Sequence, residues 1–147
     1  MQKEKVIVID VDRTIARERQ PGQSYADLEP IWSVLYKLRE YHKQGYYIIL
    51  YTSREMNKYN RNVGKILART APVLFDWLSR YDVPYDEIHF GKPWCGTKGF
   101  YVDDKAIRPG EFARLSEDEV YQLLQDDKAA LQQMEQEASP DGSAAAR

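Results

Sequence analysis

Acidic, hydroxyl and basic side chains follow four separate apolar segments of this chain, at the point where each segment ends. They are Asp10, Asp12 and Thr14, then Thr52, then Lys92, and finally Asp103 and Asp104. Because the carboxyl ends of parallel strands meet at one edge of an open sheet, we expect these side chains to lie close together. The set suits cleavage of a phosphate ester, since a carboxylate can attack phosphorus while a lysine and a hydroxyl hold the phosphate oxygens.

Each of these residues has a predicted role in such a reaction. Asp10 is the predicted nucleophile, and its attack would form a covalent phosphorylated aspartate. Asp12 lies two residues later and is the predicted general acid for the leaving oxygen and general base for water. The Thr52 hydroxyl would hold a phosphate oxygen, and Lys92 would offset the remaining negative charge.

The nucleophile and the substrate phosphate are both anions, so a divalent cation between them is expected. Mg²⁺ prefers oxygen ligands, usually one or two carboxylates together with waters and phosphate oxygens. Asp10 and Asp103 are the predicted ligands, and Asp12 and Asp104 belong to the same metal-binding set. Asp104 could instead orient Lys92 or a metal-bound water without touching the metal itself.

Five further side chains are candidates for substrate contact: Arg13, Thr14, Ser53, Arg54 and Trp94. Arg54 opens a polar loop that could hydrogen-bond substrate hydroxyls or could simply be solvated, and Ser53 could be structural. Trp94, two residues after Lys92, could stack on a sugar or a base, although tryptophan also packs in protein interiors.

The elements that must position these residues can be predicted from hydrophobic patterning. Val6–Ile9 is a continuous apolar, β-branched run, which predicts a strand buried on both faces of a parallel sheet. Further strands are predicted over 46–51, 87–90 and 99–102, and helices over 30–44, 62–79 and 116–137. Pro72 is expected to split the second helix, and Ser116 with Glu119 forms a capping-box pattern. Strands alternating with helices predict an α/β fold with a mainly parallel sheet and helices on both faces.

The length of 147 residues fits one domain. We expect this domain to span residues 1–137, followed by a disordered tail over 138–147 that is rich in Ala, Ser, Gly and Pro. The stretches between the candidate site residues are too short for a folded cap domain. The site is therefore expected to be open, unless the flap over residues 15–27 or a second copy of the chain covers it.

Composition restricts the classes of partner. The formal net charge is −2, and no basic stripe interleaved with aromatic residues is present, which argues against nucleic acid as a partner. A single cysteine, Cys95, excludes an internal disulfide and fits a reducing cytoplasm. No apolar run reaches the roughly 20 residues that a membrane helix needs, so a cytoplasmic protein without a membrane partner is expected.

Four short motifs resemble those of the haloacid-dehalogenase (HAD) superfamily: DVDRT after the first strand, YTS after the second, the lysine of GKP, and VDD. The longer stretches YTSREMNKYNRNVGKI and VPYDEIHFGKPWCGTKGFYVDDKAIRPGEF resemble a small capless branch of capsular polysaccharide biosynthesis phosphatases. The resemblance covers about residues 5–115. It implies a Rossmann-like core without a cap, and the same roles for the site residues, with Asp103 and Asp104 as a metal-binding pair. One departure is Arg13, where a glycine is common in the superfamily.

Three functions follow from these features. The first is a Mg²⁺-dependent phosphomonoesterase for a small phosphorylated metabolite, such as a sugar phosphate or a nucleotide. An open site would also suit a phosphatase for nucleic-acid ends or phosphoproteins. The third is a non-enzymatic phospho-acceptor module similar to a receiver domain. Receivers carry their acceptor aspartate after the third strand, where this chain has Lys92, so the order of residues favours the HAD interpretation.

Overall fold

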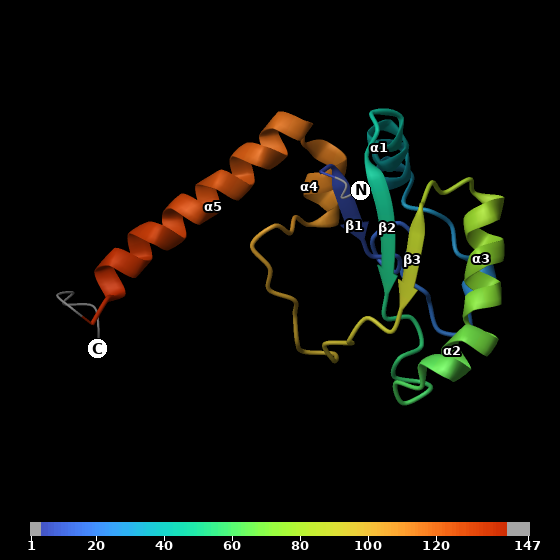
Figure 1. Ribbon diagram of the computed structural model, residues 1–147. Helices are drawn as coiled ribbons and strands as arrows, with labels where there is room; N and C mark the ends of the chain where they lie inside the picture. The colour runs from blue at the N-terminus through green and yellow to red at the C-terminus, as the bar shows by residue number, and fades with distance from the viewer. Residues whose placement is uncertain (1–3, 141–147) are drawn as a thin grey trace. The chain divides into compact units, whose positions relative to one another are not determined.

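A computed structural model describes residues 4–140 of the chain. The chain divides into two compact units, one ending at Gly99 and one beginning at Phe100, and each is described by itself. The first unit contains the sheet, with most of the buried residues (Figure 1). The extent of one domain over residues 1–137 stays a prediction.

The first unit is built on a parallel sheet of three strands in the order β1-β2-β3. The strands are β1 (Val6–Ile9), β2 (Tyr47–Thr52) and β3 (Glu87–Phe90). Ile9 pairs with Leu50 and Thr52 pairs with Phe90. The three strands therefore end at one edge, which is the lower end of the sheet in Figure 1. The predicted α/β class and the parallel sheet are confirmed.

The structure contradicts the burial predicted for β1. Its bounds agree with those predicted, but burial on both faces is wrong, because Val6 and Val8 are 37% and 60% exposed. β1 is the edge of the described sheet, so its apolar run is not enclosed as a central strand would be. In β2, buried residues alternate with half-buried ones, so the sheet of this unit is covered more fully on one face.

The helices of the first unit are α1 (Trp32–Lys43), α2 (Val63–Arg69) and α3 (Ala71–Arg80). Pro72 lies in the first turn of α3, where its missing N–H costs no helical hydrogen bond, and the predicted split is confirmed. α1 begins at Trp32, two residues later than the predicted start at Pro30. Gly45 has a φ of +94° just beyond α1, as expected for a helix-ending glycine.

The segment between β1 and α1 is tied to α3. It contains a short 3₁₀ turn, η1 (Tyr25–Asp27), and its residues Ile15 and Leu28 are buried. The indole N–H of the fully buried Trp77 donates to the Leu28 carbonyl at 2.6 Å, and Arg80 donates to the Ala26 carbonyl at 2.7 Å. Burial of a large apolar side chain stabilises a fold by roughly 1.5–3 kcal/mol, so this flap is anchored rather than loosely attached.

The second unit contains α4 (Pro109–Arg114) and α5 (Glu117–Ala138). The capping box of α5 is present, with the Ser116 hydroxyl accepting from the Glu119 N–H at 3.2 Å. The strand predicted over 99–102 is wrong: this stretch has no strand structure, and Phe100 and Val102 are 80% and 87% exposed. β-branched and aromatic residues stabilise a strand through the neighbours they pack against, and this stretch is not part of the described three-stranded sheet.

The structure describes only the first residues of the predicted C-terminal tail, and it also bears on the prediction about membrane helices. The tail expected over 138–147 begins at the last residue of α5, and from residue 141 it lies outside the described residues. Between residues 4 and 140, no helix is both long enough and apolar enough to cross a bilayer.

Candidate active site

The predicted nucleophile, hydroxyl and lysine meet at the edge where the three strands end. Asp10 directly follows β1, Thr52 ends β2, and the backbone N–H of Lys92 donates to the Thr52 carbonyl at 3.0 Å. The Lys92 Nζ lies 3.7 Å from Asp10 Oδ1, and the Thr14 hydroxyl donates to Asp10 Oδ2 at 3.4 Å. The sheet therefore brings Lys92 next to Asp10 and Thr52, which are 82 and 40 positions away in sequence (92 − 10 and 92 − 52).

A tight turn after β1 brings Thr14 back towards Asp10. The N–H groups of Ile15 and Ala16 both donate to the Val11 carbonyl at 2.9 Å, and the Arg13 N–H donates to the Ala16 carbonyl at 2.8 Å. Arg13 has a φ of +62°, in the left-handed region that favours glycine. This conformation explains why a glycine suits the position. The Arg13 side chain is exposed and pairs with Glu18 at 3.5 Å.

Left-handed backbone recurs beside each strand end. Arg13 follows Asp12, Glu55 follows Arg54 with a φ of +60°, and Gly91 precedes Lys92 with a φ of +85°. A Cβ at Gly91 would also lie only 3.1 Å from a methyl group of Val63. Such conformations cluster at functional sites, where the surrounding structure holds them in place. Glu55 and Gly91 were not among the predicted site residues, because backbone conformation at a single position is hard to predict from composition.

Electrostatics distinguish Asp10 from an ordinary surface aspartate. Burial raises the pKa of its carboxyl, and the charge of Asp12 raises it further, while Lys92 and the Val11 N–H lower it; the net effect is upward. A carboxylate in this position is incompletely compensated when ionised. The environment of Asp10 therefore favours additional positive charge.

Asp12 is held by a buried arginine. Arg54 Nη2 lies 2.8 Å from Asp12 Oδ1, and Arg54 Nε donates to Asp12 Oδ2 at 3.1 Å. The Arg54 side chain is 1% exposed, and its guanidinium carbon lies 4.4 Å from the centre of the Tyr25 ring. Arg54 was predicted to open a polar loop that is either solvated or hydrogen-bonded to substrate, and Tyr25 was not among the predicted site residues; the structure buries the Arg54 side chain.

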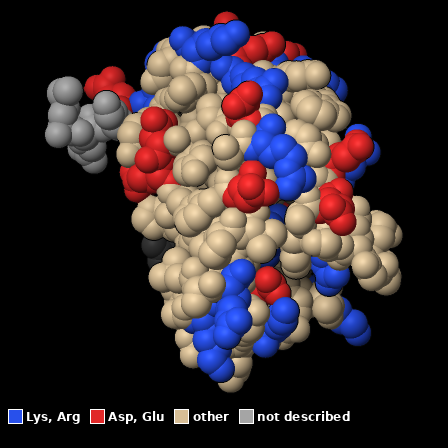
Figure 2. Space-filling view, turned by 90° about the vertical axis from the view of Figure 1, so that its right-hand side faces the viewer, with Lys and Arg blue, Asp and Glu red and all other residues tan. Residues whose placement is uncertain are grey.

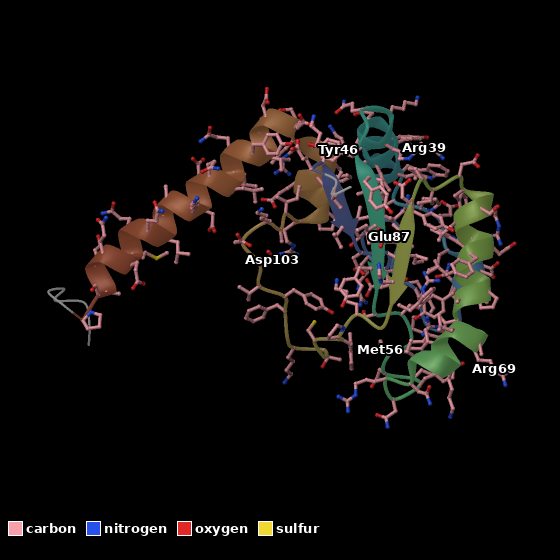
Figure 3. The ribbon with its side chains drawn as sticks, in the orientation of Figure 1. Arg39, Tyr46, Met56, Arg69, Glu87 and Asp103 are labelled. Atoms are coloured by element: carbon pink, nitrogen blue, oxygen red, sulfur yellow. The ribbon has the colours of Figure 1, made fainter. Side chains whose placement is uncertain are left out.

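The remaining predicted substrate contacts have different surroundings. Thr52 is buried, and its hydroxyl oxygen accepts from the Arg54 backbone N–H at 3.0 Å, which leaves the hydroxyl hydrogen free to donate. Ser53 is half-buried, and its carbonyl accepts from the Met56 N–H in the turn beyond β2, where Figure 3 labels Met56. Trp94 is 40% exposed, so its ring is accessible to a ligand. Substrate contact by Ser53 and Trp94 stays a prediction.

Asp103 and Asp104 belong to the second unit. Asp103 lies on the extended chain before α4 (Figure 3), and its carboxylate accepts from the Lys105 N–H at 3.0 Å. This hydrogen bond holds the pKa of Asp103 below its ordinary value. In the part of the chain that the structure describes, no three His, Cys, Asp or Glu side chains form a group that could hold a metal by themselves.

The donor chemistry of the first unit nevertheless fits Mg²⁺. This ion usually takes only one or two protein carboxylates and keeps waters or phosphate oxygens as its other ligands. Asp10 supplies a carboxylate whose surroundings favour added positive charge, and Asp12 lies two residues away. These two residues would hold the ion in this unit.

Comparison with known proteins found one similar solved structure that is informative. A structural-genomics target from Vibrio cholerae, determined by crystallography, is 43% identical in sequence and matches with a TM-score of 0.81. The match covers 84% of this chain and 99% of the Vibrio cholerae chain. No protein-family model and no curated protein matches this chain.

Proposed function

We propose that this chain, which belongs to the same family as the Vibrio cholerae protein, is a Mg²⁺-dependent phosphomonoesterase that works through a phosphorylated Asp10. The observation that carries the proposal is the position of the Lys92 ammonium, 3.7 Å from the incompletely compensated carboxylate of Asp10. A nucleophilic carboxylate beside a fixed cation, at the edge where parallel strands end, is suited to phosphoryl transfer.

In the first half of the reaction, one Asp10 oxygen attacks phosphorus and the bond to the ester oxygen breaks. Lys92 stabilises the charge on the phosphoryl oxygens, and the Thr52 hydroxyl donates a hydrogen bond to one of them. Asp12 gives a proton to the departing alcohol oxygen. Each oxygen of a carboxylate has two lone pairs, so the ion pair with Arg54 leaves Asp12 an acceptor site for the proton.

In the second half, Asp12 accepts a proton from a water molecule, and that water attacks the phosphorus of phosphorylated Asp10. The acyl phosphate bond breaks, inorganic phosphate leaves, and Asp10 is restored as a carboxylate. Mg²⁺, when bound at Asp10 and Asp12, would offset the repulsion between the nucleophile and the phosphate. Asp103 and Asp104 remain candidate ligands from the second unit.

A small phosphorylated metabolite, such as a sugar phosphate or a nucleotide, is the proposed substrate class. The open cavity of about 600 Å³ that the flap lines does not carry this choice, because none of Asp10, Asp12 and Lys92 is among its lining residues. The capless HAD core and a role in capsular polysaccharide synthesis belong to this proposal through the motif resemblance described above.

A second candidate is a phosphatase for a phosphorylated macromolecular end, and one surface feature favours it. Figure 2 shows basic side chains gathered at the lower end of the face that carries α2 and α3. The loop after β2 and α2 contribute Lys58, Arg61, Lys65 and Arg69 to this end of the unit. Basic side chains near a phosphatase site would attract a polyanion.

The test is an assay of purified protein with Mg²⁺ against sugar phosphates, nucleotides, a 5′-phosphorylated oligonucleotide, a phosphopeptide and an aryl phosphate. The expected result is phosphate release that EDTA and Asp10→Asn both abolish, with the best turnover on a small metabolite. Better turnover of the oligonucleotide would favour the second candidate. A stable phosphorylated Asp10 without phosphate release would identify a phospho-acceptor module instead.

A further inference from the structure

Arg54 is the most deeply buried charged side chain next to the proposed site. It is 3% exposed as a residue, and its side chain is 1% exposed, while the Asp12 side chain keeps 24% of its surface exposed. Transferring a guanidinium out of water is costly unless it is paired and hydrogen-bonded. The burial of Arg54 therefore indicates that its guanidinium has a specific partner.

The partner of the Arg54 guanidinium is the Asp12 carboxylate. Two Arg54 nitrogens contact the two carboxylate oxygens, at 2.8 and 3.1 Å, in the fork geometry that fixes both the position and the plane of a carboxylate. The third nitrogen, Nη1, is buried and has no hydrogen-bond partner among the described residues. Arg54 thus contributes its side-chain hydrogen bonds to Asp12 rather than to a wider network.

Two other contacts hold Arg54 itself. Its backbone N–H donates to the Thr52 hydroxyl at 3.0 Å, and its guanidinium lies 4.4 Å from the centre of the Tyr25 ring. Tyr25 belongs to η1, in the flap that Trp77 anchors to α3. Arg54 therefore joins the hydroxyl at the end of β2, the carboxylate after β1 and the flap.

We propose that Arg54, held against the ring of Tyr25, is a positioning residue that fixes the Asp12 carboxylate for its proton transfers. This inference rests on the proposed function. A side chain that is 1% exposed does not reach substrate, so Arg54 acts through Asp12 and not by binding the phosphate. Because the fork geometry is the operative feature, lysine cannot replace it: lysine keeps the charge but presents a single point of contact.

The experiment compares Arg54→Lys with the unaltered protein, using 4-nitrophenyl phosphate and Mg²⁺. The 4-nitrophenolate ion leaves without a proton, so formation of phosphorylated Asp10 needs little help from Asp12, whereas its hydrolysis needs Asp12 as general base. We expect kcat to fall by up to about 100-fold while kcat/KM changes little, because phosphorylation of Asp10 precedes the slowed hydrolysis and KM falls together with kcat. Intact-protein mass spectrometry after acid quenching should show a larger steady-state fraction of phosphorylated enzyme.

Arg39→Lys is the matched control, because Arg39 is also a partly buried arginine, and it donates to the Tyr81 carbonyl at 2.7 Å. This variant should show no accumulation. Tyr25→Leu, which removes the ring but neither charge, should accumulate phosphorylated enzyme in the same direction as Arg54→Lys, and it serves as the test if Arg54→Lys does not fold.

The outcomes separate this role from the proposed function. An active unaltered protein with no accumulation in Arg54→Lys, or in Tyr25→Leu where Arg54→Lys does not fold, would overturn the positioning role and leave the phosphatase proposal intact. An unaltered protein that neither releases phosphate nor becomes phosphorylated would overturn both.

Discussion

Asp12 and Arg13 are neighbours in the turn after β1, and each belongs to an arginine–carboxylate pair. The two pairs differ in distance and in exposure. Arg13 and Glu18 approach to 3.5 Å with side chains that are 65% and 62% exposed, whereas Arg54 and Asp12 approach to 2.8 Å with side chains that are 1% and 24% exposed. An exposed pair gains little because water and salt screen it, and its two long side chains lose freedom. A buried, two-pronged pair fixes geometry, and each partner depends on the other.

Asp12→Asn removes the acidic half of the buried pair and should have the largest effect. Loss of general acid and base catalysis is expected to lower kcat by about 10²- to 10⁴-fold. The amide also leaves the Arg54 charge without a counter-ion. Steady-state kinetics on an aryl phosphate measures the effect; Glu18→Gln, the same change in the exposed pair, should keep nearly full activity. Equal losses in the two variants would refute the contrast between the pairs.

Arg54→Met removes the basic half and should destabilise the first unit. Breaking a buried ion pair from one side costs about 3–5 kcal/mol, and the partial exposure of Asp12 places the expected loss near the lower end. Thermal or urea unfolding followed by circular dichroism measures this loss. The exposed pair of Arg13 and Glu18 supplies the control, because Glu18→Gln should shift stability by no more than about 0.5 kcal/mol.

Asp10, next to both pairs, gives a pH-dependent test. Its folded-state pKa is raised above the ordinary value of 3.8, so between these two pKa values the folded protein binds more protons than the unfolded one. The stability contribution of Asp10 is therefore present at low pH and is lost as pH rises through this window. Without Mg²⁺, Asp10→Asn should be more stable than the unaltered protein near neutral pH, and the difference should shrink on acidification.

The measurement is the melting temperature of both proteins from pH 7 down to the acid limit of folding, in EDTA. Mg²⁺ should stabilise the unaltered protein but not Asp10→Asn. A difference in melting temperature that is constant with pH would contradict the electrostatic account of Asp10.

Arg13→Gly should have the smallest effect, and in the opposite direction. A non-glycine residue in left-handed backbone costs roughly 1–2 kcal/mol, and glycine relieves this cost at the expense of a surface ion pair worth at most about 1 kcal/mol. We expect a net gain in stability of about 0.5 kcal/mol and little change in kcat. A loss of stability above 1 kcal/mol would show that the Arg13 side chain contributes more than its exposed pair indicates.

Much of the secondary structure in both units could be predicted from local patterns. The apolar runs of β1 and β3, the break at Pro72 and the capping box at Ser116 each depend on residues close together in sequence. The meeting of Asp10 with Lys92 also followed from the sequence, because parallel strand ends share an edge. The expectation that Asp103 joins this group stays a prediction, since that residue belongs to the second unit.

Other features depended on packing, which no local pattern contains. The stretch over 99–102 has the composition of a strand but no strand neighbour, and β1 is an edge strand although its apolar run resembles a central one. The burial of Arg54 was not predicted, because its polar neighbours in sequence indicated a loop that is solvated or contacts substrate. Its burial involves a distant part of the chain, because Tyr25 of the flap lies against the guanidinium and Trp77 of α3 holds the flap.

The groups available for chemistry could be read from the order of residues: a carboxylate, a lysine and a hydroxyl at the ends of parallel strands. Those assignments follow from residue type and strand periodicity, both of which act over a few residues. Folding adds the surroundings of these groups, because it buries Asp10, closes Arg54 onto Asp12 and places Tyr25 against the guanidinium. Burial and ion pairing are set by residues far apart in the chain, and they become visible only when the chain is folded.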